Sequence, residues 1–133
     1  MPSLDKSEFS DIEVGIDRML RRGSAVLDPY SKALLFQIVA FGPISVPEII
    51  RNLSMGVHSN GIYKDGEKFD WEKAWDFIVP LDDKRPVDMS VKKRIITILS
   101  ARLRQKNLCV SENKGGLNLL KLPEDRRDIV FGR

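Results

Sequence analysis

The 133-residue chain has very few of the side chains from which metal, disulfide or thiol sites are built. It contains one cysteine, Cys109, and one histidine, His58. A single cysteine excludes an internal disulfide and fits a reducing compartment. Because zinc sites in proteins use three or four ligands, His58 and Cys109 cannot form one by themselves. We therefore predict no metal and no cofactor, with His58 on a polar loop and Cys109 facing the core from a strand.

Long hydrophobic runs and nucleotide-binding motifs are missing as well. The most apolar stretch, residues 30–41, is interrupted by Gln37, and no run approaches the roughly 20 residues that cross a bilayer. The first six residues lack the apolar stretch of a signal peptide. Neither Gly-x-Gly-x-x-Gly nor a P-loop pattern is present. We expect a cytoplasmic (intracellular) protein with no membrane partner and, since no convergent catalytic set is visible, no enzymatic activity.

Charge, by contrast, is abundant and unevenly distributed. The net charge is +3 and the sequence pI is about 9.1. Residues 1–50 carry seven acidic and five basic side chains, whereas residues 90–121 carry eight basic side chains against Glu112 alone. Mild basicity permits a nucleic-acid partner, and its concentration in one stretch indicates where that partner would bind.

Apolar periodicity predicts a mainly helical single domain over residues 1–133. An amphipathic helix over 7–22 has acidic residues early and arginines late, as the helix dipole favours. Residues 28–53 should hold two core helices, capped by Asp28 and Ser45 and separated by a short extended piece after Gly42-Pro43. The first of these is apolar nearly all round, which indicates a central, buried helix.

Residues 54–89 look like an insertion. Several glycines and Asn60 mark turns, and residues 64–67 predict a tight turn. Asp70 should cap a short helix that carries Trp71, Trp75 and Phe77. The spacing of the two tryptophans favours packing against the core over an exposed stacking role.

The basic stretch forms a helix followed by a β-hairpin. Asp88 or Ser90 can cap a helix over 90–106, which is followed by a hairpin over 108–122 with its turn at 113–116. Successive residues on a helix are 100° apart, and this rule sorts the helix into two sides. The apolar side comprises Val91, Ile95, Ile98, Leu99 and Leu103, and the opposite side comprises Lys93, Arg94, Thr97, Ser100, Ala101 and Arg104. The tail, 123–133, could be a docked strand or a turn.

This order of elements resembles the winged helix-turn-helix superfamily. Residues 30–53 are similar to its first two helices, and residues 90–122 to its recognition helix and wing, joined here at Lys106-Asn107-Leu108. The resemblance is one of element order, and the segment 54–89 departs from the short turn that usually precedes the recognition helix. It implies an α+β fold, mainly helical with a small β-hairpin, an N-terminal helix and an insertion.

The residues and the resemblance together predict a protein that binds double-stranded DNA, a transcriptional regulator or a replication or partition accessory factor. The expected nucleic-acid-binding side chains are Lys92, Lys93, Arg94, Thr97, Arg104 and Lys114. The competing interpretations are a basic face that is merely solvated and a protein-protein interaction adaptor that uses the 54–89 insertion. We also predict a homodimer through the N-terminal helix, the alternative being that this helix folds back on its own domain.

Overall fold

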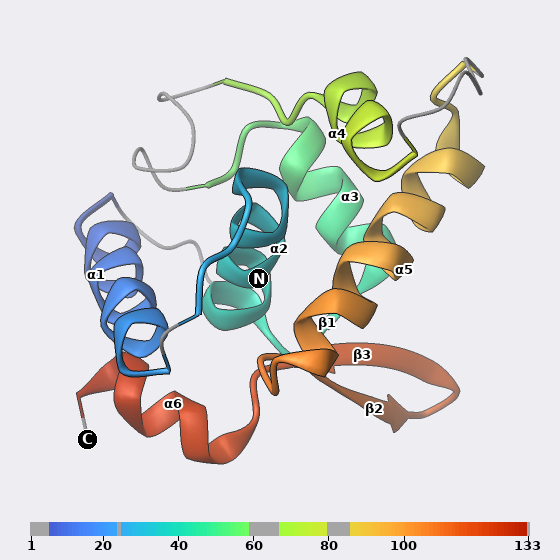
Figure 1. Ribbon diagram of the computed structural model, residues 1–133. Helices are drawn as coiled ribbons and strands as arrows, with labels where there is room; N and C mark the ends of the chain where they lie inside the picture. The colour runs from blue at the N-terminus through green and yellow to red at the C-terminus, as the bar shows by residue number, and fades with distance from the viewer. Residues whose placement is uncertain (1–5, 24, 59–66, 80–85, 133) are drawn as a thin grey trace.

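The structure is a computed structural model that describes residues 6–23, 25–58, 67–79 and 86–132 (Figure 1). Within these ranges it is an α+β fold, mainly helical with one small antiparallel sheet, compatible with a winged helix. The elements in chain order are α1 (Lys6–Arg22), α2 (Pro29–Phe41), β1 (Ile44–Ser45), α3 (Val46–Ser54), α4 (Trp71–Ile78), α5 (Met89–Gln105), β2 (Val110–Lys114), β3 (Leu117–Lys121) and α6 (Glu124–Phe131).

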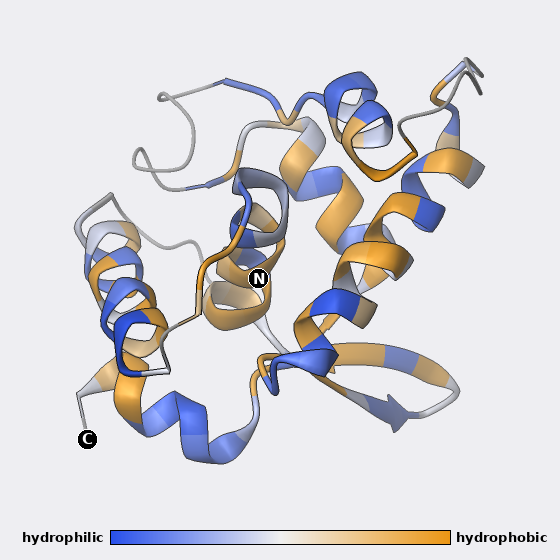
Figure 2. Ribbon diagram, in the orientation of Figure 1, coloured by the Kyte–Doolittle hydropathy of each residue, from blue (hydrophilic) through white to orange (hydrophobic). Residues whose placement is uncertain are grey.

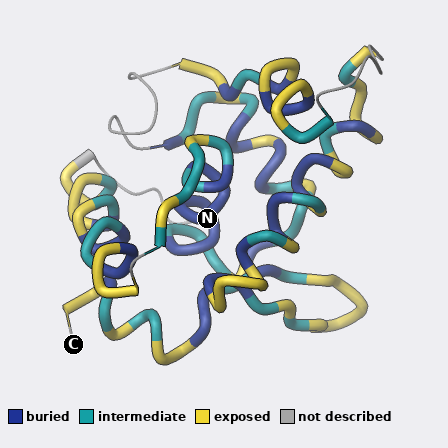
Figure 3. Tube along the Cα trace, viewed as in Figure 1, coloured by how far each residue is buried: buried dark blue, intermediate teal, exposed yellow. Residues whose placement is uncertain are grey.

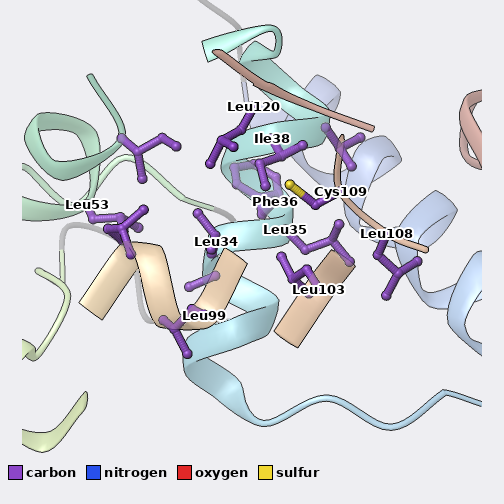
Figure 4. Close-up of a cluster of buried hydrophobic side chains, with 14 of the residues drawn as sticks. Leu34, Leu35, Phe36, Ile38, Leu53, Leu99, Leu103, Leu108, Cys109 and Leu120 are labelled. Carbon is purple, nitrogen blue, oxygen red and sulfur yellow. The ribbon is translucent and has the colours of Figure 1, made fainter. Parts of the chain in front are cut away.

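Helix α2 lies at the centre, as its apolar sequence predicts. Ala33, Leu34, Leu35, Phe36 and Ile38 are completely buried. Helices α1, α3 and α5 all pack against α2, and its side chains meet those of α5 and of the hairpin in one cluster (Figure 4). The tube coloured by burial is accordingly dark along α2 and along the inner side of α5 (Figure 3).

The sheet has the strand order β1-β3-β2, and it connects two regions that are distant in sequence. Ile44 pairs with Leu120 and Ser45 with Leu119. The hairpin turn is Gly115-Gly116, where both residues have positive φ (60° and 82°). Such a two-residue turn matches the twist of the strands, so Lys114 and Leu117 belong to the ladder and the turn is shorter than the predicted 113–116.

The C-terminal tail is a helix, and the prediction of a strand or turn there was wrong. Helix α6 packs along α1 at Gly15, where an added Cβ would lie only 2.1 Å from the carbonyl oxygen of Val130. Arg18 donates a hydrogen bond to the carbonyl oxygen of Ile129 (3.1 Å). Glycine therefore allows a close approach between two backbones, which a hydropathy pattern does not reveal.

The part of the insertion that the structure describes packs against the core through buried aromatic side chains. Trp71 and Trp75 are buried, as predicted, and the Trp71 indole N–H donates to the Ser54 hydroxyl (3.1 Å). His58 lies in a bend outside the helices and strands, as predicted, but its side chain is buried, with a ring nitrogen against the carbonyl oxygen of Glu67. The predicted tight turn at 64–67 lies largely outside the described residues.

Candidate nucleic-acid interface

Helix α5 runs along one side of the molecule, directly before the hairpin (Figure 1). Asp88 caps it by accepting a hydrogen bond from the Val91 N–H (2.9 Å), which decides between the two predicted caps. Its C-terminal end turns at Asn107, which has a φ of 58° and lets the Leu108 N–H reach the Leu103 carbonyl (2.9 Å). The helix and the hairpin are therefore joined without a flexible linker.

The inner side of α5 differs from the predicted one at three positions. Ile96 is completely buried and Ser100 is 2% exposed, whereas Ile98 is only half-buried. On the helical wheel Ile98 lies at the boundary between the buried side and the exposed side. Three helices, α2, α3 and α4, pack against α5, so its buried side is wider than one apolar stripe. The Ser100 hydroxyl is satisfied by donating to the Thr97 carbonyl (2.9 Å).

The outer side of α5 carries most of the predicted contact residues. Lys93, Arg94, Thr97, Ala101 and Arg104 are all exposed, and we call these five residues the basic face. Figure 2 shows how polar and apolar positions alternate around the helix. The Thr97 hydroxyl donates to the Lys93 carbonyl (2.9 Å), which leaves its oxygen able to accept. Gln105, which the prediction omitted, is exposed on the same side of the helix.

Three other basic residues of the 90–121 stretch are engaged with the protein itself. Lys92 lies 5.4 Å above the ring of Trp71, and Arg102 lies 5.6 Å above the ring of Phe77. Lys121 makes an ion pair with Glu112 (3.7 Å). Lys92 is thus separated from the other predicted contact residues, because it points toward α4.

The hairpin extends the basic face through a direct contact. Arg104 donates a hydrogen bond to the Ser111 hydroxyl (2.8 Å), and both residues are exposed. Lys114 is exposed beside the Gly115-Gly116 turn. Because side chains alternate along a strand, Lys114 lies on the opposite side of the sheet from Ser111. Arg104 therefore contacts the base of the hairpin, whereas Lys114 lies at its tip.

Cys109 lies behind this interface. It is 2% exposed, which confirms its predicted inward orientation, but it lies just before β2 and not within a strand as predicted. Burial raises the pKa of the Cys109 thiol, and the nearby Arg104 guanidinium acts in the opposite direction. The thiol is therefore protonated at neutral pH.

Two further properties concern possible ligands and environment. Across the described residues, histidine, cysteine and carboxylate side chains do not gather in any group of three or more that could hold a metal ion. Over the same part of the chain, helices long and apolar enough to cross a bilayer are absent.

Comparison with known proteins adds no family to this description. No protein-family model, no curated protein and no solved structure matches the chain.

Proposed function

We propose that this protein binds double-stranded DNA, with the basic face of α5 in the major groove and the hairpin tip along the adjacent backbone. The observation that carries the proposal is the position of Arg94, Thr97 and Arg104, which are exposed on the side of α5 turned away from the core. An α-helix fits the major groove, and lysine and arginine gain affinity by displacing counterions from phosphates.

The basic face divides into residues suited to phosphates and residues suited to base edges. Arg94 and Ala101 of the basic face, together with the neighbouring Gln105, fall within about 40° of one another on the helical wheel. Arginine pairs with guanine, glutamine with adenine, and a small residue such as Ala101 accommodates a thymine methyl group. Lys93 and Arg104 lie at one edge, where phosphates run. The bond from Arg104 to Ser111 fixes the guanidinium at the helix-hairpin junction, and a fixed donor suits a backbone contact.

The order of elements supports assigning the chain to the winged helix proteins. Helix α2, the short strand β1, helix α3, helix α5 and the β2-β3 hairpin follow one another as in that fold, and β1 pairs with the hairpin. Helix α4 is then an insertion packed against α5. On this assignment the role would be that of a transcriptional regulator or a replication or partition accessory factor.

Fluorescence anisotropy with a labelled random duplex, measured over a salt series, tests the proposal. We expect log K to fall linearly with log salt, because phosphate contacts release counterions. Arg94→Gln should weaken binding by about 1–3 kcal/mol if the side chain contacts a base edge. Arg102→Gln is the matched control, since it removes the same charge from the same helix at a side chain lying over Phe77.

Arg102→Gln should leave DNA affinity nearly unchanged. Equal losses for the two variants would mean that only net charge matters and that the basic face has no defined contact with the duplex. Absence of binding at low salt would refute the proposal.

The adaptor alternative has less support. Two of the three aromatic residues on which it depends, Trp71 and Trp75, are buried in the chain's own core, and Phe77 alone is exposed (45%). The predicted homodimer stays a prediction. The apolar stripe that motivated it, which includes Ile12, Ile16 and Met19, is buried within the same chain. A dimer through this helix therefore needs a different surface.

A further inference from the structure

The outer side of α1 is organised around one exposed apolar residue. The inner side packs against α2 and α6, and its buried members are Ile12, Ile16, Met19 and Leu20. Val14 points the opposite way, is 54% exposed, and is the middle residue of the helix. A helix that presents a β-branched apolar residue at its centre to solvent loses the free energy that covering this residue would provide.

Val14 is not isolated, because it borders two open grooves. One groove, of about 630 Å³, lies between α1 and α6 and contains Phe131, which is 41% exposed. The other, of about 510 Å³, contains Val26, which is 87% exposed. Val14 thus stands between two hollows, one lined by Phe131 and the other by Val26, a shape that another helix can match by packing ridges into grooves.

The charges beside Val14 are self-complementary. Asp11 and Arg18 both line the groove between α1 and α6, and they lie three residues before and four residues after Val14. If a second α1 lies antiparallel across a two-fold axis at Val14, Asp11 of each copy comes opposite Arg18 of the other. This arrangement is isologous, so a single surface on each copy satisfies both. Asp17, by contrast, is held within its own chain by Lys32 (2.8 Å).

We propose that two copies of this chain associate through the outer side of α1, antiparallel, with Val14 against Val14 at the two-fold axis and Phe131 at the margin. The surface is limited to α1 and the end of α6. We therefore expect it to bury less than the roughly 1,600 Å² of a standard interface and to give a weak, concentration-dependent association. Helix α5 lies on the other side of α2 from α1 (Figure 1), so this association does not depend on the proposed DNA binding and leaves the basic face free.

Sedimentation equilibrium on the full chain, from micromolar to millimolar concentration, tests the association. We expect a monomer-dimer equilibrium for the wild type. Val14→Asp should raise the dissociation constant at least about tenfold, because two carboxylates would face each other at the axis. Met55→Asp is the matched control, since it places the same charge at another exposed apolar residue (65%) and should change nothing.

A pair of charge reversals tests the antiparallel geometry. Asp11→Lys and Arg18→Glu should each weaken self-association, because each places like charges opposite one another. An equimolar mixture of the two variants should associate again, since the heterodimer restores both ion pairs. Thermal unfolding of Arg18→Glu reports separately on the lost hydrogen bond to Ile129.

The sedimentation results test the association, and the mixture of charge-reversal variants tests its antiparallel geometry. A wild type that stays monomeric throughout the range overturns the proposal, as does unchanged association of Val14→Asp. If the mixture fails to associate while both variants are folded, the antiparallel arrangement is wrong. DNA binding by Val14→Asp, measured by anisotropy, stays detectable in every case unless the proposed function itself is wrong.

Discussion

Replacing Ile96 or Ile98 by alanine tests which residues of α5 face the core. Ile96 has no exposed surface, whereas Ile98 lies half-buried at the boundary of the helix face. Truncating a fully buried isoleucine removes its transfer free energy and leaves a cavity, so Ile96→Ala should lower the free energy of unfolding by about 2–5 kcal/mol. Ile98→Ala removes less buried area, and solvent can fill the space, so its cost should be roughly half as large or less.

Urea unfolding followed by far-UV circular dichroism measures both changes. The midpoint should shift far more for Ile96→Ala than for Ile98→Ala, with similar slopes in the two variants, because the surface exposed on unfolding is nearly the same. Leu99→Ala gives a reference for a neighbouring side chain that is also completely buried. A larger cost at Ile98 than at Ile96 would refute the described orientation of α5, and with it the composition of the basic face.

Two further predictions concern the α1-α6 contact and the buried thiol. Gly15→Ala should destabilise the fold by about 1–3 kcal/mol, because its Cβ would meet the Val130 carbonyl oxygen at 2.1 Å; Gly23→Ala, whose nearest neighbour lies at 3.6 Å, should be nearly neutral in the same thermal melt. Cys109 should react with iodoacetamide much more slowly in the folded protein than in urea, because burial raises the pKa of its thiol. This thiol ionises more readily in the unfolded chain, so its contribution to the free energy of unfolding should decline as the pH rises above 9.0. The wild type should therefore lose more stability than Cys109→Ala between pH 8 and 10. Equal losses in the two proteins would contradict this.

Much of the local structure was determined by the sequence alone. Three predicted helix caps each accept a hydrogen bond from the backbone N–H three residues later; they are Asp28, Ser45 and Asp70. The glycine pair specifies the hairpin because only residues that tolerate positive φ fit such a turn. These features depend on residues within one turn of each other, and a sequence displays them directly.

The candidate interface was predictable in its main members for the same reason. Arg94, Thr97 and Arg104 are spaced by three and seven residues, so helix geometry alone brings them to one side. Whether that side faced solvent depended on how much of α5 its neighbours cover. The structure brings Ile96 and Ser100 inside and leaves Ile98 at the boundary, and three helices, α2, α3 and α4, pack against α5.

The tertiary structure alone decided which distant segments meet. Helix α6 was not foreseen because its contact with α1 depends on the absence of a side chain at Gly15. Lys92 and Arg102 were grouped by charge in the sequence, yet each lies over an aromatic ring of the α4 segment, about 20 residues away along the chain. Periodicity shows which side of a helix is buried but not which element covers it. The free energy of burying an apolar side chain depends on the area removed from water and not on which segment covers that area.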